Sequence, residues 1–152
     1  MTEGTSQADE TSPGAFWVLL GALTIAFHIG LVFVGLVPNL VARPLHMALA
    51  LPWTLVLVAR NRFERVTGIV LSAVGIAILL GLACRQEALG NQYGFLEGNF
   101  QIGCAIVLLL ITLEMARRSI GWPLPLVAAA ALAYGLWGEH IPGEFGHPGI
   151  PP

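Results

Sequence analysis

The chain has 152 residues, of which 56% are hydrophobic and only 11% are charged, and its mean hydropathy is +0.78. A soluble domain carries about 25% charged residues, so this composition is typical of an integral membrane protein and excludes most soluble enzymes. All seven basic residues are arginines, and the net charge of -2 leaves no basic footprint for a nucleic acid. Two cysteines are too few for a disulfide framework or a metal knuckle.

Residues 1–15 are polar and acidic, with Glu3, Asp9 and Glu10 and no basic residue. They predict a short disordered tail. The tail has no positive segment, and the apolar run after it is longer than the roughly 7 to 15 residues of a signal-peptide core. We therefore expect the first apolar segment to stay in the mature protein.

Five apolar runs are long enough, or nearly so, for the about 20 helical residues that a bilayer core requires. Pro52 is expected to kink the second, whereas Pro123 and Pro125 lie in the first turn of the fifth, where proline is tolerated. The fold class expected is all-α, a polytopic membrane helical bundle with an irregular Pro/Gly-rich tail at 139–152. The predicted spans are 16–37, 40–59, 66–83, 101–118 and 122–138.

Arginine placement predicts the orientation. Three arginines lie at 60–65 between spans two and three, and Arg117 and Arg118 lie between spans four and five. Two spans separate these groups, so both should lie on one side, and arginines near span ends stay cytoplasmic. Only Arg43 and Arg85 would lie outside. We expect the N-terminus inside and the C-terminus outside.

Small residues at four-residue spacing occur in three spans and favour close helix packing, although glycine and alanine are abundant in any membrane helix. The stripes are Ala22, Ala26 and Gly30, then Ala73, Ala77 and Gly81, then Ala129 and Ala133.

Few residues offer chemistry. His28 lies mid-span and is either a proton relay or ligand, or a neutral imidazole bonded to a neighbouring helix; with no mid-span carboxylate to partner it, the second is favoured. The spacing of His140 and His147 matches no zinc signature. No nucleophile–base pair or phosphate-cradling loop is present, so no enzyme activity and no catalytic, cofactor-binding or metal-binding residue is predicted.

Cys84 and Cys104 both lie near the predicted outer face. Either a disulfide closes the loop between spans three and four, or both are free thiols in apolar surroundings. The sequence leaves both alternatives open.

Glu114 precedes Arg117 and Arg118 by three and four residues, so it can pair with either on one helix face. Both arginines can also reach lipid phosphates. The residues alone favour a topological anchor. The loop at 90–100 is either a docking surface or a flexible turn whose Tyr93 and Phe95 enter the interface.

Three strings resemble the N-terminal membrane region of permeases of the tripartite ATP-independent periplasmic (TRAP) transporters, in the subclass with TAXI-type solute-binding proteins. Departures are Met115 and Ala116, where that family usually has alanine and threonine, and Pro148, where arginine is usual after histidine. A looser likeness covers 27–38 and 43–46. The strings are YGFLEG at Tyr93–Gly98, LEMARRSIGWPLP at Leu113–Pro125 and AYGLWGEHIPGEFGHPG at Ala133–Gly149.

The resemblance implies a non-catalytic small membrane subunit of the bacterial inner membrane, without cofactor. Its implied partners are the large permease subunit, a periplasmic TAXI-type solute-binding protein and membrane lipids, with no nucleic acid. The chain ends where a fused permease would continue, so a split subunit and a fragment both remain open. The interface and docking candidates are Tyr93, Gly94, Glu97, Gly98, Glu114, Arg117, Arg118, Pro142, Gly143, His147 and Gly149.

The resemblance leaves substrate and coupling ion undefined beyond organic acid-like solutes. The main alternative is an autonomous homo-oligomeric transporter or channel, which needs charge along a pathway where only His28 is mid-membrane. A further alternative is a membrane enzyme or assembly factor that uses outer-face residues such as His140 and Glu139.

Overall fold

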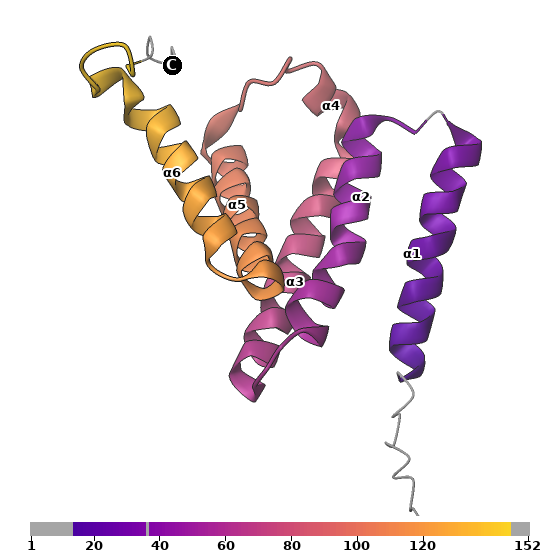
Figure 1. Cartoon of the computed structure of the whole chain (residues 1–152). Coiled ribbons are helices and arrows are strands. Elements are labelled where there is room, and N and C mark those ends of the chain that lie inside the picture. The colour runs from indigo at the N-terminus through magenta and orange to yellow at the C-terminus, as the bar shows by residue number, and fades with distance from the viewer. Residues whose placement is uncertain (1–13, 36, 147–152) are drawn as a thin grey trace, which may run out of the picture. The chain divides into compact units, whose positions relative to one another are not determined.

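A computed structural model describes residues 14–35 and 37–146 of the chain, and these residues form an all-α structure (Figure 1), which confirms the predicted fold class. Nearly all of the expected tail at 1–15, and the candidates His147 and Gly149, lie outside the described residues. The chain divides into two compact units, residues 1–37 and 38–152, each described by itself below.

The first unit contains a single described helix, α1 (Ala15–Val34). Its 20 residues span about 30 Å at about 1.5 Å per residue, which matches a bilayer core. The helix ends because Gly35 adopts a left-handed conformation with φ 57°, and its N–H donates to the Leu31 carbonyl over 3.2 Å. Glycine adopts this conformation without the steric cost of a Cβ atom.

The second unit begins with α2 (Asn39–Pro52), which continues into η1 (Trp53–Leu57), one wider π-helical turn. Proline at position 52 removes a backbone donor, and the α-helical ladder of hydrogen bonds gives way to a π-helical turn after it; the expected kink stays a prediction. The next helix, α3 (Arg62–Cys84), starts at Asn61, whose side-chain oxygen accepts the Glu64 N–H over 2.8 Å. This is a standard asparagine N-cap.

The remaining helices are α4 (Gln86–Gly90), α5 (Gly98–Ile120), α6 (Pro123–Trp137) and η2 (Gly138–His140). Four segments of the described chain are long and apolar enough to cross a membrane, namely Ala15–Phe33, Asn39–Leu57, Arg62–Cys84 and Gly98–Ile120. The fifth expected span forms α6, whose 15 residues reach only about 22 Å, short of a bilayer core. The short helix α4 was not predicted.

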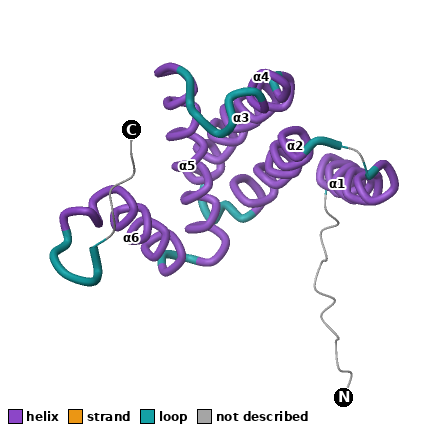
Figure 2. The backbone as a smooth tube through the Cα atoms, turned by 90° about the horizontal axis from the view of Figure 1, so that it is seen from above, coloured by secondary structure: helices purple, strands orange, loops and turns teal. Residues whose placement is uncertain are grey.

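Viewed along the helices, α3 lies between α2 and α5 in the second unit (Figure 2). The core of this unit is small, as expected where lipid rather than protein covers most apolar side chains. Its buried hydrophobic side chains are Ala48, Leu51, Leu55, Leu79 and Ile111.

The packed face of α3 consists of Gly68, Ser72, Gly75 and Leu79, all buried. At Gly75 an added Cβ would lie 2.7 Å from a Leu51 methyl group, so the buried Leu51 side chain occupies the space that a larger residue would need. The expected stripe on α3 was therefore wrong in register: Ala73, Ala77 and Gly81 are exposed, and a second set of small residues makes the contact. Small residues permit close packing, as in other membrane helix pairs.

Candidate functional site

The most extensively bonded polar side chain of the described residues is the guanidinium of Arg118, near the end of α5. Its Nε donates to Glu114 Oε1 over 2.7 Å, and its Nη1 donates to the carbonyls of Leu55 and Glu64, each over 2.7 Å. Its Nη2 donates to the Thr67 hydroxyl over 3.0 Å. Four of the five guanidinium N–H groups are thus used, and only 4% of the side chain is exposed.

The Leu55 carbonyl is available because the helical segment formed by α2 and η1 ends two residues later, at Leu57. The last carbonyls of a helix have no partner within the helix and must find one elsewhere. Leu55 is completely buried, so an unsatisfied carbonyl there would be costly. Arg118 supplies the missing donor and thereby joins the end of η1 to α5.

Gly68 makes this junction sterically feasible. A Cβ at this position would collide with the Leu55 carbonyl and would lie 2.9 Å from Arg118 Nη1. Glycine is therefore required for close backbone approach rather than for an unusual dihedral angle, since Gly68 has no positive φ. At Gly68 the backbone of α3 therefore lies close to both the Leu55 carbonyl of η1 and the Arg118 guanidinium.

Glu114 links the two neighbouring arginines. Arg117 binds it through two hydrogen bonds, from Nε to Oε2 over 2.7 Å and from Nη2 to Oε1 over 2.8 Å, the bidentate geometry preferred between arginine and carboxylate. Arg117 also lies 4.0 Å from a Glu64 carboxylate oxygen and 5.6 Å from the centroid of the Trp122 ring. We use the name Arg118 cluster for the following residues: Leu55, Glu64, Thr67, Glu114, Arg117, Arg118 and Trp122. Its two acids and two arginines balance in charge.

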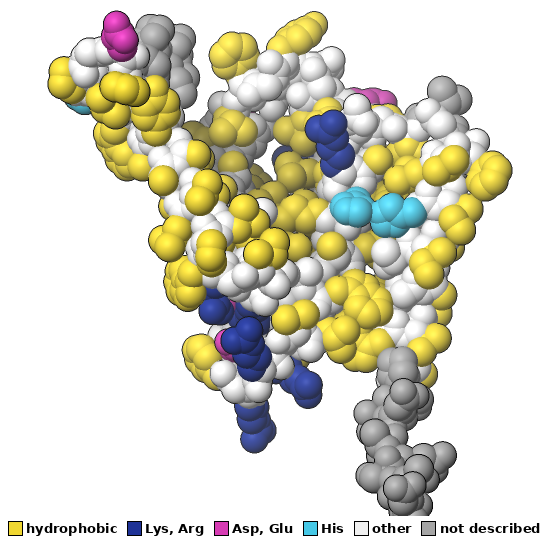
Figure 3. Space-filling view, viewed as in Figure 1, with side chains coloured by type: hydrophobic (Ala, Val, Ile, Leu, Met, Phe, Trp, Pro, Cys, Tyr) yellow, Lys and Arg dark blue, Asp and Glu magenta, His cyan; other side chains and the backbone are white. Residues whose placement is uncertain are grey.

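The Arg118 cluster brings the two arginine-rich segments together, because Glu64 from the start of α3 contacts both Arg117 and Arg118 from the end of α5. The prediction that they share one side of the bundle is confirmed, and Figure 3 shows dark-blue side chains gathered there. We call this side the arginine end and the opposite side the loop end. The assignment of the arginine end to the cytoplasm stays a prediction.

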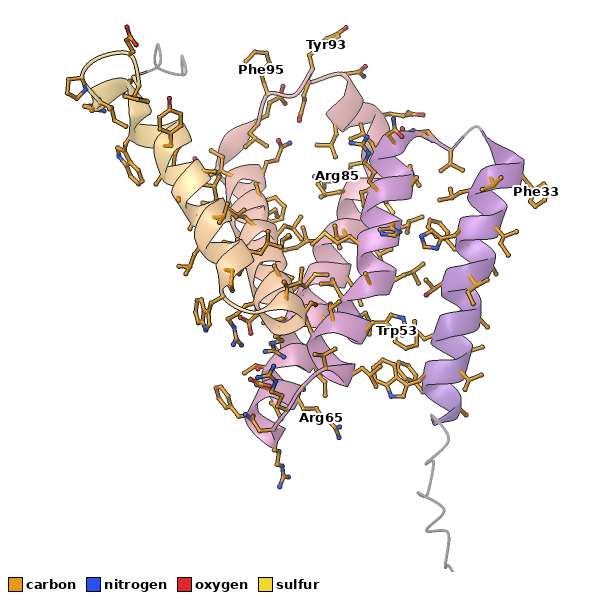
Figure 4. The ribbon with its side chains drawn as sticks, viewed as in Figure 1. Phe33, Trp53, Arg65, Arg85, Tyr93 and Phe95 are labelled. Atoms are coloured by element: carbon orange, nitrogen blue, oxygen red, sulfur yellow. The ribbon has the colours of Figure 1, made fainter. Side chains whose placement is uncertain are left out.

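The loop end contains the predicted docking loop. Tyr93 and Phe95 are 89% and 76% exposed, and Figure 4 shows both at this end. Gly94 and Gly98 have φ of 90° and 82°, a backbone conformation that favours glycine. Tyr93 itself has φ 52°, an uncommon value for a residue with a side chain.

Hydrogen bonds give this loop a defined shape. Glu97 accepts a hydrogen bond from Gln92 Nε2 over 3.0 Å, and the Glu97 N–H donates to Gln101 Oε1 over 2.8 Å. These bonds connect the loop to the first turn of α5. That the loop is a docking surface stays a prediction.

The described part of the C-terminal tail folds back on α6. The Tyr134 hydroxyl donates to the Phe145 carbonyl over 2.8 Å, and Gly143 has φ 90° in the turn after Pro142. The predicted candidates Pro142 and Gly143 thus lie in a turn tied to α6. They are not brought into contact with the Arg118 cluster by any described hydrogen bond or ion pair.

The other sequence candidates differ in outcome. His28 Nδ1 donates to the Thr24 carbonyl of its own helix over 2.6 Å, and the expected bond to a neighbouring helix stays a prediction. Cys84 and Cys104 are both free thiols, so of the two alternatives the structure has the second. Across residues 14–35 and 37–146, no group of three metal-ligating side chains comes together.

Sequence reasoning found Glu114, Arg117 and Arg118 but missed Leu55, Glu64 and Thr67. The signal for Glu64 was present, because the parity of the arginine groups placed residues 60–65 beside the end of span four. The sequence contains no such signal for the Leu55 carbonyl, because every residue has a backbone carbonyl and the residue type does not indicate which one accepts a hydrogen bond.

The chain matches no known family model, no curated protein and no solved structure in the comparisons.

Proposed function

We propose that the chain is the small, non-transporting membrane subunit of a TRAP-type secondary transporter in a bacterial inner membrane. In this role it supports the large permease subunit and presents a periplasmic surface to a TAXI-type solute-binding protein. The solutes would be organic acid-like. The proposal rests on the resemblance of three strings in the second half of the chain, and the geometry of those strings adds support.

The observation that carries the proposal is the position of the most specific string. Its Arg118 fastens α5 to α3 and to the end of η1, and its Glu114 binds both Arg117 and Arg118. A string used for fastening helices suits a scaffold better than a transport pathway. Four of the five Arg118 N–H groups are bonded within the chain, so Arg118 would support a partner interface indirectly. The side chains of Arg117 and Glu114 stay partly exposed, 28% and 25%.

The distribution of buried polar groups also favours a scaffold over an autonomous channel. In the described residues of the chain, the buried polar side chains are only Ser72 and Arg118. Both lie in helix contacts within the second unit. An ion or solute pathway needs polar or charged groups along its length within the membrane.

The direct experiment is affinity purification of the chain from its native membranes in mild detergent, followed by mass spectrometry. We expect a large multi-span permease in fixed ratio, together with a soluble solute-binding protein. A homogeneous self-oligomer that conducts solute flux in liposomes would contradict the proposal and support the alternative of an autonomous transporter.

Glu114→Ala tests the assigned interface. It removes the acceptor of both Arg117 hydrogen bonds and leaves that guanidinium with only its 4.0 Å contact to Glu64 and the Trp122 ring, so we expect less permease to co-purify. Glu87→Ala is the matched control, since Glu87 is an exposed carboxylate on α4 outside the Arg118 cluster. Normal co-purification by a folded Glu114→Ala variant would remove Glu114 from the interface.

A further inference from the structure

The helices α3 and α5 enclose a cavity of about 510 Å³ toward the loop end, on the side away from the Arg118 cluster. Figure 3 shows a hollow lined by hydrophobic side chains between these helices. Small side chains create the space, among them Ala77, Gly81 and Ala105. Its volume lies within the about 300 to 1,000 Å³ typical of ligand pockets.

The lining of the cavity changes in polarity along its length. Arg85 and Gln101 lie at the loop end, whereas Ala77 and Leu108 lie deeper along α3 and α5. Ala77 and Arg85 are eight residues apart, which corresponds to about 12 Å along a helix. The cavity therefore has a cationic mouth near the end of α3 and an apolar interior, which is the polarity of one anionic phospholipid with its headgroup at the surface.

Arg85 is available for an external anion. The structure gives its side chain no hydrogen bond and no ion pair with any described residue of the chain. Figure 4 shows it at the upper end of α3. A guanidinium is suited to a phosphate, because its planar set of donors matches the phosphate oxygens.

The geometry of the loop end argues against a transmembrane helix as the occupant. Leu89 of α4 and Leu96 of the connecting loop also line the cavity. The chain itself thus crosses the loop end between α3 and α5, where a spanning helix would have to pass. An acyl chain enters sideways from the bilayer and ends inside, so this obstruction does not affect it.

We propose that the cavity between α3 and α5 binds an acyl chain of an anionic phospholipid whose phosphate is held by Arg85. The proposal is independent of the subunit role above, because it concerns only this chain and the bilayer. It also explains why Ala77 and Gly81 are small yet make no close helix contact, a pattern that helix packing alone leaves without a reason.

The test uses the full chain in phosphatidylcholine nanodiscs that contain a phosphatidylglycerol probe with a diazirine at the end of one acyl chain. After irradiation, the labelled peptides are mapped by mass spectrometry. We expect labelling concentrated on residues 77–82 and 104–108. The phosphatidylglycerol probe should label about fivefold more than the matching phosphatidylcholine probe, and Arg85→Gln should bring the two to parity. Arg43→Gln, which changes another exposed arginine, should keep the preference.

Variants that fill the cavity provide a second test of the proposal in the same labelling experiment. A Cβ at Gly81 meets nothing within 4 Å, so Gly81→Leu should fold and should lower the labelling several-fold. Gly103→Leu is the matched control, because Gly103 is equally unobstructed but does not line the cavity. Ala105→Leu repeats the test from α5 if Gly81→Leu fails to fold.

Three results would overturn the proposal: equal labelling by the two lipid probes, labelling spread evenly over the other apolar helix faces, or the same labelling in Gly81→Leu and Gly103→Leu. No labelling of residues 77–82 and 104–108 by either probe, in nanodiscs that hold two copies of the chain, would assign the cavity to a dimer contact instead.

Discussion

The two ends of the α3–α5 pair differ in how the helices are held. At the arginine end, Arg118 binds α5 to α3 and η1 through three hydrogen bonds within 3.0 Å. At the loop end, the same two helices separate around a cavity with small apolar side chains and an unpaired Arg85. Lipid tails are as apolar as leucine, so burial of apolar surface alone gives little drive for association inside a bilayer. Polar bonds and close backbone contact fasten the pair where they occur.

The largest expected effect comes from removing the guanidinium at the arginine end. Arg118→Leu leaves Glu114, the Leu55 carbonyl and the Glu64 carbonyl without their shared donor, so we expect a loss of about 3 to 5 kcal/mol in the free energy of unfolding. Titration with denaturing detergent, followed by circular dichroism, measures it.

Arg118→Lys should recover only part of that loss, because an ammonium group cannot reproduce the planar arrangement of donors. Arg62→Leu, an exposed arginine at the same end, is the control. A loss below 1 kcal/mol in Arg118→Leu would mean that the cluster does not fasten the helices.

A smaller effect is expected at the backbone contact. Gly68→Ala places a methyl group against the Leu55 carbonyl and displaces Arg118, which should lower the free energy of unfolding by about 1 to 3 kcal/mol. The same substitution at Gly103, where an added Cβ meets nothing within 4 Å, should stabilise its helix by up to about 1 kcal/mol. Equal effects at the two glycines would contradict the role of close approach.

Much of this contrast follows from the sequence, and some of it does not. The parity of the arginines and the spacing of Glu114, Arg117 and Arg118 predicted a paired cluster at one end. The contact face of α3 was misjudged because Gly68, Ser72 and Gly75 follow a less regular spacing than Ala73, Ala77 and Gly81. Regular spacing in the sequence identifies the small residues that could form a helix contact. The partner helix and its backbone carbonyls determine which of these residues form it.

The helix α6 is shorter than the span expected there, and its crossing of the membrane stays a prediction. Its apolar run was counted as a span because Trp122 and Gly138 extended it on either side, but the helix includes only Pro123–Trp137. Left-handed Gly121, with φ 98°, precedes the turn at its start, and η2 follows its end. Hydropathy alone does not place such turns.

The smallest effect is expected at Ser72, whose hydroxyl is buried and has no described hydrogen-bond partner. Ser72→Ala removes a buried hydroxyl that makes no described hydrogen bond, so the free energy of unfolding should stay unchanged or rise by about 1 kcal/mol. Thr67→Val is the contrasting variant, because its hydroxyl accepts from Arg118, and it should lose about 1 kcal/mol. A clear loss in Ser72→Ala, measured in the same detergent titration, would show that the hydroxyl has a partner.

The central claim is that α3 and α5 are fastened at one end only. Double electron–electron resonance in nanodiscs tests it most directly, because it measures the distance between two spin labels. In a Cys84→Ser and Cys104→Ser background, one labelled pair replaces Val66 and Ile120 at the arginine end, and the other replaces Leu80 and Ile102 at the loop end; all four side chains are exposed. We predict a narrow distance distribution for the first pair, broadened by Arg118→Leu, and a broad one for the second. Two equally narrow distributions, unchanged by Arg118→Leu, would contradict the account.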